Sequence, residues 1–237
     1  MKIILSPAKK MKVDTDSIDT MSSPVFLEKA EEILGWMQGR TEEELKKLWK
    51  CNDKITTENI ERIKTMNFQK QLTPAVLAYE GIAYQYMAPA VFEDGHFDYV
   101  QEHLRILSAF YGVLKPMDGI TPYRLEMQAK AAIGDFTNLY DFWRDNLYRE
   151  VIDDSRIIIN LASKEYSKCI EKYLTPDDRY ITKGTYAKMA RGEMVRYMAE
   201  NHIENPDDIK EFDHLGYVFR DDISSDREYI FERKTVK

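Results

Sequence analysis

The sequence predicts a single mixed α/β (α+β) domain spanning residues 1–237, with a central mixed sheet flanked by helices. A chain of 237 residues that is 43% hydrophobic and 32% charged can bury a sizeable core. Short apolar runs typical of buried strands alternate with segments that carry helix-capping residues. No internal repeat, low-complexity tract or Gly/Ser linker marks a boundary between domains.

The predicted strands are short runs rich in aliphatic residues. Their compactness is typical of strands that are buried on both faces, and residues 104–110 and 156–161 are expected to anchor the sheet. Residues 74–79 fit either a helical turn or a strand, because so short an apolar run has no readable period. The other predicted strands are residues 2–5, 179–182, 216–219 and 229–232.

The predicted helices are recognised by their ends. Ser23 and Pro24 are typical of a helix start, and Thr41 with Glu44 forms a capping-box pattern. Asn205 and Pro206 end the clearest helix of the chain. The helices are expected at residues 25–36, 41–50, 58–66, 163–173 and 186–203.

Several function classes are not favoured. The chain has no apolar run of about 18 residues, and Pro7 interrupts the first apolar stretch, so neither a membrane span nor a signal peptide is predicted and a cytoplasmic location is expected. Cys51 and Cys169 form no C-x-x-C pair, and the four histidines lack the i, i+4 spacing of a helical metal site. We therefore expect no metal site and no cofactor.

The charge is unevenly distributed. A formal net charge of −7 disfavours indiscriminate binding of polyanions, which depends on Lys and Arg. Residues 204–228 carry nine acidic side chains, whereas residues 183–196 carry four basic ones against the single acid Glu193. Any site for an anion must therefore be local.

The helix expected at residues 186–203 has a basic face. Lys188, Arg191 and Arg196 flank Gly192 there, and a glycine inside a helix costs about 1 kcal/mol relative to alanine. Either an anion binds this face, with the glycine allowing close approach, or the face is solvated and the glycine serves helix packing.

Two polar segments follow predicted strands, where ligands bind in open α/β sheets. Ser6 and Lys9 follow the first strand, although the glycines of a P-loop are absent. Ser163 and Lys164 follow the strand at 156–161, where Ser163 could bind an oxyanion or simply cap a helix. Glu126 and Glu165 could act as acid/base groups or pair with cations.

Residues 104–127 interleave cations with aromatic rings. Arg105, Lys115 and Arg124 occur among Phe110, Tyr111 and Tyr123, a mixture that suits either base stacking on nucleic acid or an ordinary core. Residues 111–113 are similar to the turn of a helix-hairpin-helix motif, a pattern of three residues that many proteins contain by chance.

Several long blocks, taken in order, resemble the YaaA family of peroxide-stress proteins. They are LSPAKK at residues 5–10, LRILSAFYGVLKPMDGITPYRLEM at 104–127, NLYDFW at 138–143, INLASKEY at 159–166, YAKMARGEMVR at 186–196 and GYVF at 216–219.

The resemblance implies a cytoplasmic protein that limits free iron and hence peroxide damage, with DNA bound through a positively charged cleft. It also implies a mixed α/β fold with a helix-hairpin-helix element. Carried over to this sequence, the cleft comprises Ser6, Lys9, Tyr123, Arg124, Glu126, Ser163, Lys164, Lys188 and Arg191. Met189 stands where family members often carry a second basic residue, so weaker duplex binding is expected.

Three functional hypotheses remain open at this point. The first is a stress protein that binds the DNA backbone in the cleft, which makes DNA the expected partner. The second is an enzyme acting on a nucleotide or modified base, with Lys9, Glu126 and Ser163 as chemical groups. The third is direct iron sequestration by acids such as Asp213, Asp221 and Asp222.

Overall fold

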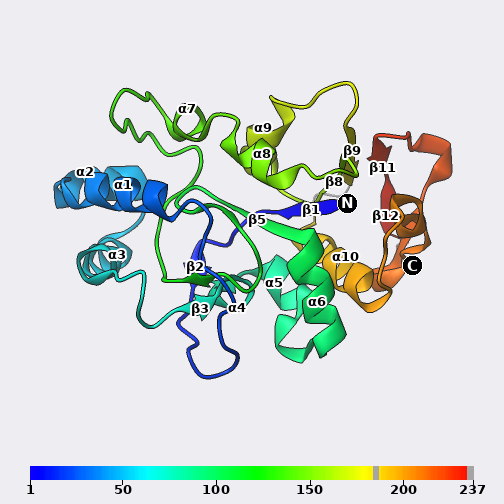
Figure 1. Cartoon of the computed structure of the whole chain (residues 1–237), viewed down its shortest axis with the longest axis horizontal. Coiled ribbons are helices and arrows are strands. Elements are labelled where there is room, and N and C mark those ends of the chain that lie inside the picture. The colour runs from blue at the N-terminus through cyan, green and yellow to red at the C-terminus, as the bar shows by residue number, and fades with distance from the viewer. Residues whose placement is uncertain (184–186, 234–237) are drawn as a thin grey trace.

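A computed structural model of the chain describes residues 1–183 and 187–233, and it has the predicted mixed α/β architecture (Figure 1). The central sheet has six strands in the order β11-β9-β8-β1-β5-β6. All neighbouring strands in it are parallel except β5 and β6, which form an antiparallel hairpin at one edge. The strands are β1 (Lys2–Leu5), β5 (Leu104–Ser108), β6 (Gly112–Leu114), β8 (Ile157–Asn160), β9 (Arg179–Lys183) and β11 (Glu228–Tyr229).

Three two-stranded sheets complete the β structure. They pair β2 (Lys10–Met11) with β4 (Tyr79–Glu80), β3 (Thr73–Pro74) with β7 (Gly119–Ile120), and β10 (Tyr217–Phe219) with β12 (Phe231–Arg233). Between β3 and β4 the chain forms a single helical turn, α4 (Ala75–Ala78), so the ambiguous residues 74–79 contain both kinds of structure. The strand expected at residues 229–232 is divided at Ile230 between β11 and β12.

Helices cover both faces of the central sheet. Figure 1 shows α8 (Asn146–Val151) and α9 (Lys164–Glu171) on one side, with α5 (Ile82–Met87), α6 (Asp94–His103) and α10 (Lys188–Glu200) on the other. Helices α1 (Leu27–Gln38), α2 (Glu42–Trp49) and α3 (Asp53–Thr65) project away from the sheet at one end of the molecule, and α7 (Leu139–Trp143) precedes α8. Short 3₁₀ turns span Pro89–Val91, Pro206–Glu211, His214–Gly216 and Asp221–Ile223.

The helix starts only partly follow the predictions. The capping box of α2 is confirmed, since Thr41 Oγ1 accepts from Glu44 N and Thr41 N donates to Glu44 Oε2. The expected start of α1 at Ser23 and Pro24 is wrong, because this segment pairs instead with the loop before β7. Ser22 Oγ donates to Asp118 Oδ1 at 2.5 Å there, and α1 begins only at Leu27.

The segment that is similar to a helix-hairpin-helix turn adopts a different structure. Residues 109–111 form the tight turn between β5 and β6, and Gly112 has a φ of +79°. A side chain at Gly112 would also collide with Phe26 and Trp143, each 2.8 Å from the added Cβ. Residues 111–113 therefore lie in a β-hairpin. A helix pair joined by a short turn is formed by α2 and α3 instead.

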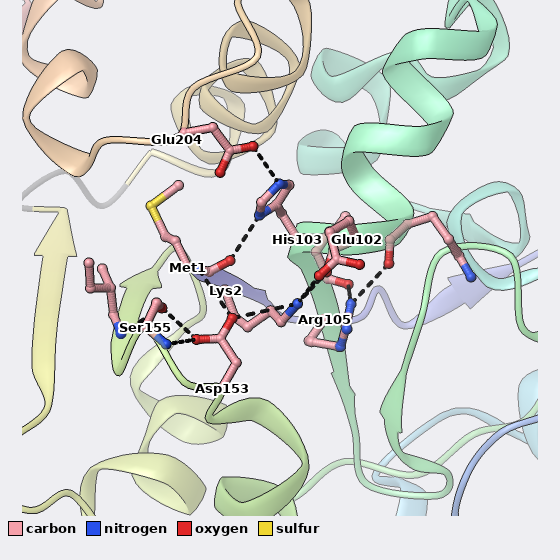
Figure 2. Close-up of polar contacts among 11 residues, drawn as sticks. Met1, Lys2, Glu102, His103, Arg105, Asp153, Ser155 and Glu204 are labelled. Carbon is pink, nitrogen blue, oxygen red and sulfur yellow. Dashed lines mark hydrogen bonds and ion pairs between the residues drawn. The ribbon is translucent and has the colours of Figure 1, made fainter.

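Polar contacts hold the amino-terminal end of β1 (Figure 2). Lys2 is buried, and its Nζ donates to the backbone oxygen of Glu102 at 2.8 Å and to Glu102 Oε1 at 2.6 Å. The Met1 ammonium pairs with Asp153 Oδ2 at 3.1 Å, and His103 Nδ1 donates to the Met1 carbonyl at 2.9 Å. These contacts tie the amino-terminal end of β1 to the segments that precede β5 and β8.

Strand order creates a crevice at the carboxyl ends of the strands. From β1 the chain proceeds to β5 on one side, whereas from β8 it proceeds to β9 on the other side. The loops after β1 and β8 therefore diverge, which makes a topological switch point of the kind at which open α/β sheets bind ligands. Of the helices formed by the described residues, none combines the length and hydrophobicity that a membrane span requires.

Candidate functional site

A cavity of about 500 Å³ lies at the switch point between β1 and β8. Its walls come from the loop after β1, the β4–α5 junction, residues 123–126, the start of α9 and the first turns of α10. The volume falls in the range of about 300–1,000 Å³ that is typical of small-molecule sites. Of the nine predicted site residues, these eight line it: Ser6, Lys9, Tyr123, Arg124, Glu126, Ser163, Lys188 and Arg191. Lys164 is exposed on α9 and is not among the lining residues.

Two serines join the strand ends at the base of the cavity. Ser163 N donates to Ser6 Oγ at 2.8 Å, and Ser6 Oγ donates to Ser163 Oγ at 3.1 Å. Tyr84 OH donates to the Ser6 carbonyl at 3.0 Å. Ser163 occupies the N-cap position of α9, but its hydroxyl makes no capping bond to the helix. The two loops after β1 and β8 are thus fixed to each other by side chains that also face the cavity.

Lys9 and Arg124 share one carboxylate. Lys9 Nζ lies 2.8 Å from Glu126 Oε1, and Arg124 Nη2 lies 3.5 Å from the same oxygen. The Nε of Arg124 is buried and has no hydrogen-bond partner in the described part of the chain. Because two cations compete for a single acid, this wall carries an excess of positive charge.

Lys188 and Arg191 form the second cationic wall. Neither side chain has a carboxylate within ion-pair distance among residues 1–183 and 187–233. Burial lowers the pKa of the Arg191 guanidinium, because desolvation disfavours its charged form. The third predicted cation of this face, Arg196, lies outside the cavity and pairs with Glu200 at 2.7 Å. The basic face therefore contributes two of its three cations to the cavity.

Gly192 brings this wall into place by close helix packing. A Cβ added to Gly192 would lie 1.7 Å from the Ala83 carbonyl oxygen and 2.9 Å from Met87 N. The backbone of α10 therefore contacts α5 directly, as only glycine permits. The packing interpretation of this glycine is correct, and the same packing sets Lys188 and Arg191 against Ala83 and Tyr84 around the cavity.

The aromatic rings of residues 110–123 belong to the core. Phe110 and Tyr111 are fully buried, so the stacking of bases on these two rings is excluded, and the alternative of an ordinary core is correct. Tyr123 contributes to the cavity wall, yet its hydroxyl lies 2.7 Å from Ser108 Oγ and 2.9 Å from Tyr79 OH. Burial raises the pKa of Tyr123 to about 12, so its phenol is neutral at physiological pH.

Several lining residues were not predicted from sequence. Glu80, Ile82 and Tyr84 come from the β4–α5 junction, and Tyr166 comes from α9. Glu165, considered only as an acid/base group, also lines the cavity and accepts from Gln128 N at 3.2 Å through Oε1. One signal in the sequence was Gly81, where an added Cβ would lie 2.8 Å from the Ala8 Cβ. Glycine permits such a close approach because it lacks a Cβ.

No support for direct iron binding comes from the part of the chain that is described. No group of three or more His, Cys, Asp or Glu side chains suited to a metal ion occurs there. Asp222, one of the acids considered for iron, instead pairs with Arg220 at 2.6 Å.

Comparison with known proteins identifies the family. The sequence profile of the family described as "Peroxide stress protein YaaA" matches residues 1–223. The chain belongs to the YaaA family. The resemblance read from the sequence blocks is thereby confirmed, and the match includes every residue of the cavity wall.

Curated relatives match this YaaA family member over nearly its full length. A UPF0246 protein of Agathobacter rectalis is 68% identical, and the alignment covers 99% of both chains. A UPF0246 protein of Desulfitobacterium hafniense is 52% identical, with 98% of this chain and 97% of the relative aligned. A third, from Ligilactobacillus salivarius, is 50% identical over 98% of this chain and 99% of its own.

Membership of a peroxide-stress family raises the question of thiol reactivity. Cys169 is buried, and burial raises the pKa of its thiol to about 12, whereas Cys51 is half-buried. Because the thiolate is the reactive form, we expect a thiol reagent or peroxide at neutral pH to modify Cys51 and spare Cys169. Peptide mass mapping after labelling of native and denaturant-unfolded protein measures the extent of modification at each cysteine. Equal labelling of both cysteines in the native protein would contradict it.

Proposed function

We propose that this YaaA family protein binds DNA through the positively charged side of the cavity and so protects DNA during peroxide stress. The observation that carries the proposal is the cationic wall of Lys188 and Arg191, which lack carboxylate partners in the described part of the chain. A half-buried guanidinium without a counterion is unfavourable, and a phosphate oxygen would satisfy it.

The other cations of the cavity support the same role. Lys9 is 65% exposed and Arg124 is 14% exposed, so the first stands at the rim while the second lies deeper. Phosphate oxygens would compete with Glu126 for both side chains. Arginine and lysine bound to phosphates supply most of the affinity of non-specific DNA binding by releasing counterions.

The net charge of −7 limits the strength of this binding. Acidic residues over the carboxyl-terminal segment repel a long duplex, so binding depends on the few cations of the cleft. In the proposed role the protein works in the cytoplasm and limits the damage that free iron causes to DNA in the presence of peroxide. Direct retention of iron is not part of the proposal, since no ligand cluster in the described residues supports it.

Salt dependence tests the proposal. Anisotropy of a labelled duplex, titrated with the purified protein, is expected to show affinity that falls by about 0.9 log unit per log unit of salt for each phosphate contacted. The slope of log affinity against log salt is expected to correspond to about two to four phosphates, because only a few cations line the cavity. The absence of duplex binding even at low salt would contradict the proposal.

An enzyme acting on a nucleotide or modified base is the second candidate. It is favoured by the placement of Lys9, Glu126 and Ser163 around one small cavity. They come from three separate segments, and together they supply an amine, a carboxylate and a hydroxyl at one site. Running the same titration with mononucleotides as competitors separates the two functions. A mononucleotide that binds more tightly than the duplex supports the enzyme.

A further inference from the structure

The inner wall of the cavity is built from rings and aliphatic side chains. Tyr84 and Tyr123 are each 4% exposed and Tyr166 is 6% exposed, and Leu5 and Leu161 lie beside them. The hydroxyl of Tyr84 is bonded to the Ser6 carbonyl, and that of Tyr123 to Ser108 and Tyr79. With these hydroxyls engaged inside the protein, the small part of each tyrosine that is exposed to the cavity is apolar ring surface.

The charged side chains of the cavity are more exposed than its rings. The ammonium groups of Lys9, Lys10 and Lys188 are exposed at the mouth, and Arg191 is half-buried. Lys9 pairs with Glu126 and Lys10 with Glu80 at 2.9 Å, so Lys188 and Arg191 are the cations that have no carboxylate partner in the described part of the chain. An apolar interior with cations at its opening is complementary to a molecule with a planar apolar part and an anionic part. A nucleotide has both, in its base and its phosphate.

A paired base cannot use such a wall. Within a duplex the bases are stacked, so a protein reaches only their edges in the grooves. The ring faces become accessible only when a nucleotide leaves the stack, as in enzymes that extrude a base into a pocket. A cavity of about 500 Å³ has room for a small molecule and not for a double helix.

We propose that the cavity receives one unpaired nucleotide of a DNA strand, an inference that rests on the proposed DNA binding. Its base lies against Tyr84, Tyr123 and Tyr166, and its flanking phosphates lie near Lys188 and Arg191. The Ser163 hydroxyl supplies a donor for a base edge, because its proton finds no acceptor among the described residues. Extrusion costs least for a mismatched, bulged or single-stranded base, so the protein prefers DNA in which a base is already unpaired.

The base analogue 2-aminopurine tests this inference, since its emission rises when it leaves the base stack. We would place it in a single-base bulge and in a fully paired duplex of matched sequence. Wild-type protein is expected to bind the bulged DNA at least about tenfold more tightly, with an emission increase confined to the bulge.

A blocking variant and a matched control locate the bound base. Ile82 lines the cavity and is 49% exposed, so Ile82→Trp adds bulk to the opening without removing a charge or disturbing the core. Val91 is 64% exposed and does not line the cavity, which makes Val91→Trp the control. Ile82→Trp is expected to bring the ratio of the affinities for bulged and paired DNA towards one. Val91→Trp is expected to keep the wild-type ratio.

The outcomes separate this inference from the proposal on which it rests. Equal affinity for bulged and paired DNA, without an emission change, would overturn the extruded nucleotide and leave DNA binding standing. A preference for the bulge that survives in Ile82→Trp would place the base elsewhere and also overturn the inference. The absence of binding to either DNA would overturn both.

Discussion

Gly192→Ala is expected to destabilise the protein by about 3 kcal/mol, although alanine is the better helix former by about 1 kcal/mol. The added Cβ would lie 1.7 Å from the Ala83 carbonyl oxygen, which is backbone and cannot turn aside. Helices α5 and α10 must therefore separate. Because Lys188 and Arg191 lie on α10, the same displacement should weaken binding in the cavity.

Gly35→Ala is the matched control for this substitution. Gly35 lies inside α1, and a Cβ added there meets no atom of the described residues within 4 Å. The control is expected to stabilise the protein by up to about 1 kcal/mol, since only helix propensity changes. Urea unfolding measures both variants through the denaturation midpoint at constant slope. A Gly192→Ala variant as stable as Gly35→Ala would show that the two helices do not pack this closely.

The fold was predictable where local signals agreed with the tertiary structure. The apolar runs that became β1, β5 and β8 are buried on both faces, and their composition indicates this. The start of α1 was not predictable, because Ser22 forms its hydrogen bond with Asp118, 96 residues away in sequence. Nor were the short helices α5, α7 and α8, since five or six residues do not display a helical period.

The candidate site was predictable in its residues but not in its shape. Polar side chains that follow strands meet at the switch point, which explains why Ser6 and Ser163 come together. Their bond joins residues 157 positions apart, and no spacing rule anticipates it. The contribution of Tyr84 depended on helix α5, and the sharing of Glu126 by Lys9 and Arg124 appears only in three dimensions.

Lys188→Ala/Arg191→Ala is expected to lower DNA affinity by at least about tenfold at physiological salt. Each cation that contacts a phosphate adds about one to the slope of log affinity against log salt, so the slope should fall by about two. Stability should change little, because Lys188 is exposed and burial disfavours the charge of Arg191. Loss of binding in this variant would thus report on the contact with DNA and not on unfolding.

The control for charge alone is Lys54→Ala/Lys70→Ala. Both lysines are exposed, neither has an ion-pair partner among the described residues, and neither lines the cavity. This variant also removes two positive charges, but from residues that do not line the cavity. It is expected to retain most of the affinity and nearly the full salt slope.

The most informative measurement is the salt-dependent anisotropy of labelled DNA, compared for the wild-type protein and these two double variants. If DNA binds at the cavity, Lys188→Ala/Arg191→Ala loses affinity and its salt slope falls by about two, while Lys54→Ala/Lys70→Ala stays close to the wild type. Equal affinity and equal slope in all three proteins would contradict DNA binding at this cleft.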